Sequence, residues 1–209
     1  MCKKRKIYTM SELSAAMMAA FNKINADWFG GDLEKVIITF EEGYKKGAYG
    51  WICTDKDWEQ NGTARYHINI SSDYLDRSVY AVISTLVHEM CHLYNLQNGK
   101  QDTSRSGIYH NKVFKDTAEA HGLNVEHIDK AGWCRTSCTV QLMQWIDDNV
   151  TFSALHLYKK RADPSEGKES KPKQSTRKYV CPCCGLIVRA TKDCRISCID
   201  CDEEMKLES

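Results

Sequence analysis

Apolar residues recur every three or four positions near the start of the chain, which predicts an amphipathic helix over residues 11–28. Its apolar positions are Leu13, Ala16, Met17, Ala20, Phe21, Ile24 and Trp28. Thr9 and Glu12 have the spacing of a capping box at the beginning of this helix. The pair Gly30-Gly31 is typical of a helix end.

Three short segments rich in β-branched or aromatic residues follow and predict strands, at residues 36–40, 48–53 and 65–71. Residues 42–47 predict a turn between the first two strands. The polar residues 55–62 predict a loop between the second and the third. This part of the chain therefore predicts a small sheet.

The longest apolar segment, residues 78–97, predicts a buried central helix, because it is apolar on nearly every face and contains no Gly or Pro. Gly99 is typical of its end. After a polar loop at residues 100–107, another helix is predicted over residues 110–123, and a last amphipathic helix over residues 140–146. Helices and strands together predict an α+β fold.

The pattern changes after residue 158. Residues 159–178 have no apolar periodicity and many charged side chains, which predicts a flexible basic linker. Residues 179–209 form a short cysteine-rich module. We therefore predict an α+β domain over residues 1–158, a linker over 159–178 and a small module over 179–209.

Composition restricts the class of protein. With 42% hydrophobic and 27% charged residues, the chain is typical of a soluble globular protein. It has no run of eighteen apolar residues, so we expect no transmembrane helix and no membrane partner. The first ten residues, MCKKRKIYTM, lack the apolar core of a secretory signal. We expect a cytoplasmic protein, and association with the nucleoid is compatible with that location.

The net charge of +1 conceals an asymmetry between the two parts of the chain. Residues 1–158 carry 17 Lys and Arg against 19 Asp and Glu, whereas residues 159–209 carry 12 against 9. The second part therefore has a mild basic bias, which is compatible with binding to nucleic acid.

The stretch LVHEMCHLYNLQNG places His88 and His92 four residues apart within the predicted central helix. Residues at this spacing lie on one helix face, where two imidazole nitrogens can bind one zinc ion. Glu89 lies about 100° around the helix from His88 and can act as general base, as in the HExxH metalloproteases. The alternative is a buried helix whose histidines only form hydrogen bonds. We disfavour it because a carboxylate and two imidazoles are costly to bury without a metal or partners.

A catalytic zinc ion needs at least one further protein ligand. We prefer His110, because the loop before it is long enough to fold it back onto the central helix. Glu119 is a weaker candidate. We expect surface roles for His121 and His127.

The chain resembles the SprT-like family of zinc metallopeptidases, which includes the Spartan-type DNA-dependent proteases. The similarity covers about residues 21–114 and rests on FNKINADWFGGDLEKVIITF, AYGWI, HINIS, STLVHEMCHLYN and YHNKVF. The family implies a zincin-like domain, in which a small sheet packs on the HExxH helix. It implies catalysis by Glu89 and one catalytic zinc ion held by His88, His92 and His110. Tyr109 and Asn111 flank the third histidine, where the family often has Gly and Pro.

The chemistry implied is metal-assisted hydrolysis of an amide, as in a zinc metalloendopeptidase, with Glu89 moving the proton of the attacking water. Tyr94, Tyr109 and His121 are alternative donors to the oxyanion. The predicted strand at residues 66–71 can hold an extended substrate by edge pairing.

Six of the eleven cysteines lie in the last thirty residues. Two CxxC pairs separated by thirteen residues predict a zinc ribbon with one structural zinc ion. Its four ligands would be Cys181, Cys184, Cys198 and Cys201. Cys183 and Cys194 are left over, and we interpret the CxxxC pair Cys134 and Cys138 as small buried residues. The resemblance extends to this module, since many members of the family carry such a ribbon.

The resemblance to the Spartan-type members implies proteolysis of DNA-associated or DNA-crosslinked proteins, and hence a role in repair of DNA–protein crosslinks. We expect a protein substrate, with single-stranded or mixed DNA bound through the basic linker and the ribbon, where Arg189, Lys192 and Arg195 can contact phosphates. The alternative is a nucleic-acid-binding accessory or regulatory zinc protein with a SprT-like fold and little or no proteolysis. Glu89 argues against it, because a pure binding role needs no base beside the metal.

Overall fold

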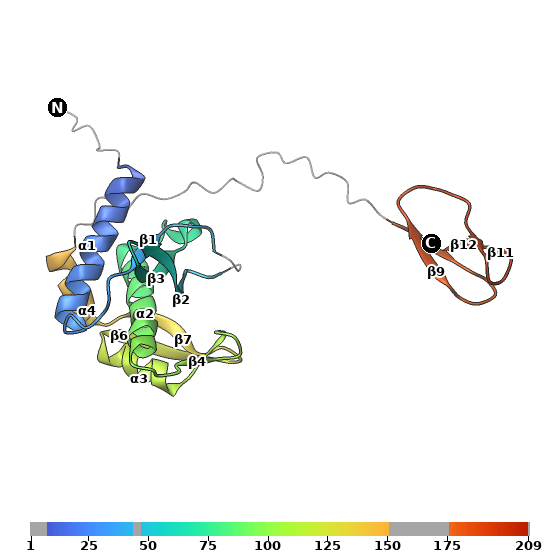
Figure 1. The fold of residues 1–209 in the computed structure, drawn as a ribbon. Helices are drawn as coiled ribbons and strands as arrows, with labels where there is room; N and C mark the ends of the chain where they lie inside the picture. Colours follow the sequence, from blue (N-terminus) through green and yellow to red (C-terminus); the bar gives the residue numbers. More distant parts are fainter. Residues whose placement is uncertain (1–7, 44–46, 151–175, 209) are drawn as a thin grey trace, which may run out of the picture. The chain divides into compact units, whose positions relative to one another are not determined.

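The computed structural model describes residues 8–43, 47–150 and 176–208 (Figure 1). The chain divides into two compact units, Met1–Arg161 and Ala162–Ser209. Most of the predicted linker, residues 159–175, lies outside the described residues. None of the helices in the described parts combines the length and apolar content that crossing a membrane requires.

The first helix, α1 (Met10–Trp28), begins at the predicted capping box. The side-chain oxygen of Thr9 accepts a hydrogen bond from the backbone N–H of Glu12, whose carboxylate accepts one from the backbone N–H of Thr9. These bonds satisfy N–H groups that a helix start otherwise leaves without partners. The buried face of α1 consists of Leu13, Met17, Ala20, Phe21 and Ile24.

A three-stranded sheet follows, with the strand order β1-β3-β2. Its strands are β1 (Ile37–Thr39), β2 (Gly50–Gln60) and β3 (Thr63–Ile70). β1 is parallel to β3, whereas β2 and β3 form an antiparallel hairpin. β3 is therefore the central strand, and the prediction that it pairs with substrate at an edge is wrong, because both of its sides are occupied.

The prediction of a loop at residues 55–62 is also wrong. β2 continues through this segment, and the hairpin turns at Asn61 and Gly62, which have φ angles of 53° and 74°. A pair of residues with positive φ is typical of a two-residue hairpin turn. The segment is polar because its side chains are exposed, so apolar alternation could not indicate the strand.

The helix α2 (Val79–Gln97) lies at the centre of the first unit in Figure 1, with α1 on one side and β7 on the other. Ser78 caps its beginning by accepting a hydrogen bond from the backbone N–H of Ala81. Six of its core side chains are 0% exposed: Val82, Ile83, Leu86, Val87, Met90 and Leu93. The central, buried helix that the sequence predicted is confirmed.

A second sheet, of order β4-β5-β7-β6, packs against α2 mainly through β7. The elements that follow α2 are β4 (Thr103–Ser104), β5 (Tyr109–His110), α3 (Lys112–Ala120), β6 (Leu123–Ile128), β7 (Gly132–Cys138) and α4 (Val140–Asn149). The sequence did not predict β6 and β7. His110 was predicted to begin a helix but lies in β5, and Asn111 caps α3 after it. Asn111 accepts hydrogen bonds from the backbone N–H groups of Val113 and Phe114.

The second unit consists of short strands in two small sheets, β12-β8-β9 and β10-β11. The strands are β8 (Arg177–Val180), β9 (Ile187–Ala190), β10 (Ser197–Cys198), β11 (Glu203–Glu204) and β12 (Lys206–Glu208). The end of the predicted linker is corrected, because Arg177 and Lys178 already belong to β8. Among the described residues of this unit, the buried ones are Tyr179, Cys181, Cys198 and Met205.

Candidate metal centres

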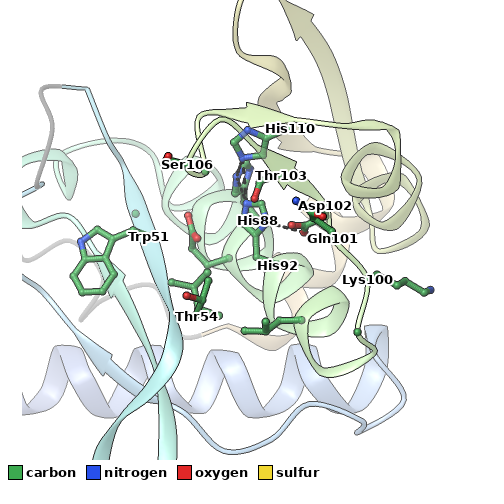
Figure 2. Close-up of a pocket in the computed structure, with 16 residues that line it drawn as sticks. Trp51, Thr54, His88, His92, Lys100, Gln101, Asp102, Thr103, Ser106 and His110 are labelled. Atoms are coloured by element: carbon green, nitrogen blue, oxygen red, sulfur yellow. Dashed lines mark hydrogen bonds and ion pairs between the residues drawn. The ribbon is translucent and has the colours of Figure 1, made fainter.

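Three histidine side chains from two elements converge in the first unit (Figure 2). The Nε2 atom of His88 lies 3.2 Å from that of His92 and 3.2 Å from that of His110, and the last two are 3.1 Å apart. Three such atoms cannot all pair by hydrogen bonds, because each carries one proton or one lone pair. Ligands at 2.0–2.1 Å around a tetrahedral zinc ion lie about 3.3–3.4 Å apart. The arrangement therefore fits one zinc ion.

The outer nitrogen atoms of two of these histidines are held by polar side chains. His92 Nδ1 lies 2.7 Å from Asp102 Oδ2, and His88 Nδ1 lies 3.1 Å from Thr136 Oγ1. Such contacts keep the proton on Nδ1 and leave Nε2 to bind a metal. Asp102 is itself buried and also accepts a hydrogen bond from Asn95 Nδ2, at 3.0 Å. Neither Asp102 nor Thr136 could be predicted from the sequence, because nothing in the local pattern marks them.

Burial keeps His88 and His110 neutral in the zinc-free protein. It lowers the pKa of His88 well below 6.5, and the neighbouring rings of His92 and His110 add to the effect. Burial is also the main cause that lowers the pKa of His110 to about 4. Neutral imidazole is the form that binds a metal ion. At neutral pH, no proton has to leave the rings of His88 and His110 before zinc binds.

The third histidine depends on a close contact between two strands. β5 pairs with β7 at His110 and Gly132. Gly132 has a φ of +72°, and a Cβ atom built on it would lie 2.1 Å from the carbonyl oxygen of His110. Glycine is the residue that tolerates both this backbone conformation and this approach. This role of Gly132 could not be predicted from the sequence.

Glu89 lies beside the three histidines and is 5% exposed. Burial raises its pKa to about 7. Gly50, at the start of β2, allows the sheet to approach this carboxylate, because a Cβ there would lie 3.2 Å from Glu89 Oε1 and 2.8 Å from Thr85 Cγ2. A carboxyl group with a pKa near neutrality can both accept and return a proton.

Two pockets meet at this site, and Gly50, His88, Glu89 and His110 line both. The first pocket, of about 770 Å³, extends along β2 past Trp51, Ile52 and Thr54 (Figure 2) and toward the β4–β5 loop at Ser106 and Gly107. The second pocket, of about 890 Å³, lies between residues 47–50, the first half of α2, and β7. The two pockets therefore leave room for an extended peptide on both sides of the histidine group.

Three predicted oxyanion donors lie outside both pockets. The ring of His121 stacks on Phe29 at 4.0 Å, and that of Tyr94 lies 6.1 Å from the same ring. The ring of Tyr109 lies 6.4 Å from that of His127. None of the three donors lines the site, so these predictions are wrong.

The weaker ligand candidate Glu119 also lies elsewhere. Its carboxylate pairs with Lys115 Nζ at 2.8 Å on the exposed side of α3. His127 is exposed, as expected for a surface residue, whereas His121 is half-buried against Phe29. The expectation of a surface role for His121 is therefore wrong.

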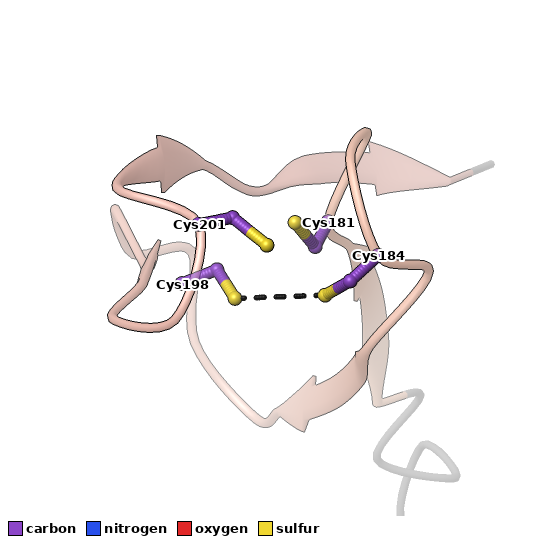
Figure 3. A group of neighbouring side chains, drawn as sticks. All are labelled: Cys181, Cys184, Cys198 and Cys201. Carbon is purple, nitrogen blue, oxygen red and sulfur yellow. Dashed lines mark hydrogen bonds between the residues drawn. The ribbon is translucent and has the colours of Figure 1, made fainter.

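The second unit brings four cysteines together, two from each CxxC pair (Figure 3). The Sγ atoms of Cys181, Cys184, Cys198 and Cys201 all lie within 4.8 Å of one another. The distance from Cys184 Sγ to Cys198 Sγ is 3.7 Å, close to the roughly 3.8 Å between sulfur ligands at 2.3 Å from a tetrahedral zinc ion. Backbone N–H groups, first that of Cys184, lower the pKa of Cys181 to about 7. The donor set fits a structural zinc ion, and Cys183 and Cys194 are exposed outside it.

The geometry thus defines a mixed α+β protein with two candidate metal-binding groups in its described residues, three histidines and four cysteines. The SprT-like family model matches residues 17–139, more than half of the chain, and the protein therefore belongs to the SprT-like family. The match includes all three histidines and Glu89. No curated protein and no solved structure gave a match.

Proposed function

We propose that the protein is a zinc-dependent metallopeptidase that hydrolyses peptide bonds in DNA-associated or DNA-crosslinked proteins. The observation that carries this proposal is the convergence of the Nε2 atoms of His88, His92 and His110 beside the buried carboxyl group of Glu89. A zinc ion held by these histidines would supply Lewis acidity, which lowers the pKa of a bound water toward ~7 and polarises a substrate carbonyl. Family membership supports the same class of activity.

Glu89 has the position and the acidity of a proton carrier. Its carboxylate accepts a proton from the attacking water and gives it to the nitrogen of the leaving amine. Burial raises its pKa to about 7 in the zinc-free protein, a value suited to exchange of a proton near neutral pH. The rigid helix α2 fixes this carboxylate relative to His88 and His92.

β2 is the strand best placed to hold a substrate. It forms one edge of the three-stranded sheet in the described residues, and it runs from the second pocket into the first. An extended peptide can add to this edge through main-chain hydrogen bonds. Antiparallel pairing, the more stable arrangement per residue, would place residues C-terminal to the cleaved bond in the second pocket.

The second unit supports a role near DNA. A zinc ion bound by its four cysteines would stabilise a unit whose own core is too small to fold alone. Arg189 and Lys192 are exposed and can contact phosphates. Arg195 pairs with Glu204 at 2.8 Å, so we expect it to contribute less.

Cleavage of a basic DNA-binding protein, with and without single-stranded DNA, tests the proposed activity. We expect the zinc-loaded protein to cleave it with DNA present, and Glu89→Gln to lower the rate by at least about 10²-fold while keeping its zinc. Zinc content is measured in both samples. Absence of cleavage by the fully zinc-loaded protein under every condition would favour the alternative, an accessory nucleic-acid-binding protein.

Deletion of residues 159–209 tests the role of the second part separately. We expect the truncated protein to keep its fold and zinc-binding histidines but to lose the stimulation of cleavage by DNA. Circular dichroism and zinc content check the fold and the metal site. Unchanged stimulation by DNA would show that the linker and the ribbon are not the DNA-binding elements.

A further inference from the structure

The second pocket contains a fixed arginine that the proposed reaction does not use. Arg77 lies just before α2, and Arg77 and Arg135 are both among the residues that line the pocket. Glu89, at the metal centre, is the only acidic residue among the described residues that line it. The part of the second pocket that lies away from Glu89 is therefore positively charged.

Uncharged groups hold Arg77 in place. Its Nε donates to the carbonyl oxygen of Tyr74 at 2.8 Å, and its Nη1 donates to that of Ala81 at 3.2 Å. Its Nη2 donates to Thr85 Oγ1 at 3.0 Å, and the guanidinium lies 4.1 Å from the centre of the Tyr49 ring. A guanidinium has five N–H groups, so two remain for a ligand.

Arg77 forms no ion pair with a carboxylate of the described residues, and the neighbouring Asp76 acts on it only through a Coulomb interaction. Arg77 is half-buried, and this partial burial lowers its pKa. The N-terminal end of the nineteen-residue α2, capped by Ser78 in the same pocket, adds positive potential. An arginine preorganised in this way is suited to bind a carboxylate.

A buried hydroxyl of the same pocket lacks a polar partner. Ser84 is 3% exposed, lines the second pocket and has no hydrogen-bond partner for its Oγ among the described residues. The carbonyl oxygen of Tyr80, one turn earlier in α2, instead accepts from Cys138 Sγ at 3.3 Å. A buried hydroxyl without a partner is costly, and a polar ligand would remove that cost.

We propose that the second pocket binds an acidic side chain of the substrate, with Arg77 as the residue that selects it. The proposal rests on the proposed peptidase function and specifies its substrates. With a peptide antiparallel to β2, the acidic residue lies on the C-terminal side of the cleaved bond. A nucleic-acid phosphate is the competing anion. A side chain fits better, because Arg77 is half-buried inside a pocket that continues from the metal centre.

Binding of matched peptides tests this subsite without requiring cleavage. Zinc-loaded Glu89→Gln protein is titrated with peptide pairs that carry Asp or Asn at each of the first three positions after the intended cleavage site. Fluorescence anisotropy gives the affinities. We expect about tenfold tighter binding of the Asp peptide at one position, as for a hydrogen bond to a charged group. In the Glu89→Gln background, Arg77→Gln should abolish this preference.

Two further variants control for fold and for general electrostatics. Arg135→Gln removes the same charge from the same pocket, but Arg135 is exposed and pairs with Glu126 at 3.4 Å, so the preference should remain. Arg77→Lys keeps the charge and loses the forked geometry, so the preference should fall to about two- to threefold. If Arg77→Gln fails to fold, Arg77→Lys serves as the test instead. An unchanged preference of Arg77→Lys for the Asp peptide would contradict the proposal.

The outcomes separate this subsite from the proposed function. Equal affinity for the Asp and Asn peptides, or a preference that persists in folded Arg77→Gln, overturns the subsite. Loss of affinity for a single-stranded oligonucleotide in Arg77→Gln, without loss of the Asp preference, would assign the arginine to phosphate and also overturn it. Cleavage of the same peptides by the zinc-loaded wild-type protein is scored separately and tests the peptidase function alone.

Discussion

Asp102 shows how one side chain outside the histidine group can control metal binding. Its carboxylate holds His92 Nδ1 at 2.7 Å and is itself held by Asn95. Asp102→Asn should lower zinc affinity about 10- to 100-fold, as for other partners of metal-binding histidines. Competition with a chromophoric chelator measures the affinity. Asp129→Asn, on the exposed surface, is the control, and equal affinities of the two variants would rule out this role.

The histidines also predict how acid affects the zinc-free protein. The pKa of His110 is about 4 in the folded state and near 6.5 when exposed, so the unfolded chain binds more protons between these values. Stability should therefore be lost as the pH falls from 6.5 toward 4. Urea unfolding of the chelator-treated protein across this range measures the effect. In His110→Asn the loss should be smaller, and an identical pH dependence would contradict the assignment.

At the residue scale, the sequence could predict the candidate metal ligands and the candidate base. It could not predict the side chains that fix their orientation by hydrogen bonds. His88, Glu89 and His92 share one short helical motif, so their proximity follows from helix geometry. Thr136 is 48 positions from His88, and no local pattern connects such residues. The same limit explains the wrong oxyanion donors, because the direction of Tyr94 and His121 depends on packing against Phe29.

At the element scale, the pairing of β5 with β7 is what positions the third histidine. Gly132→Ala would place a Cβ 2.1 Å from the carbonyl oxygen of His110, so the strands would have to separate. We expect a loss of stability of about 2–4 kcal/mol together with weaker zinc binding. Thermal unfolding and chelator competition measure the two effects.

A matched control for this substitution is Gly31→Ala. Gly31 also has a positive φ, of +81°, but no atom lies within 4 Å of its added Cβ. The stability of Gly31→Ala should fall only by the roughly 1–2 kcal/mol that a left-handed conformation costs, and its zinc affinity should be unchanged. If both variants bound zinc equally well, the close approach at Gly132 would not be what holds His110.

The helices were predictable because their buried faces repeat at a helical period, whereas several strands were not. β6 and β7 carry exposed and half-exposed residues over most of their length, so alternation of apolar residues is weak. Their pairing, from Leu123 with Cys138 to Ile128 with Gly132, is set by tertiary contacts with α2 and α3. The far half of β2 was missed for the same reason, since no core covers it.

At the scale of the whole molecule, the two candidate metal groups should respond differently when zinc is removed. The second unit has few buried residues apart from its cysteines, so a strong chelator should unfold it and expose four thiols. The first unit has a large apolar core and should keep Cys91 and Cys138 protected, because burial raises the pKa of both thiols.

Maleimide labelling followed by mass spectrometry measures this difference. The exposed Cys183 and Cys194 should react in both states, whereas the four clustered cysteines should react only after chelation: Cys181, Cys184, Cys198 and Cys201. Rapid labelling of all four in the zinc-loaded protein would contradict the structural zinc site.

The close approaches at Gly50 and Gly132 have a consequence for the evolution of this site. A site of this geometry leaves no room for a side chain at either position, so selection on the metal centre also acts on two glycines distant from it in sequence. Gly50 precedes His88 by 38 residues, and Gly132 follows His110 by 22. Descendants that no longer used the candidate metal centre would be free to replace them. A related chain that keeps its HExxH motif but has bulky residues at both positions should therefore have lost this arrangement of histidines.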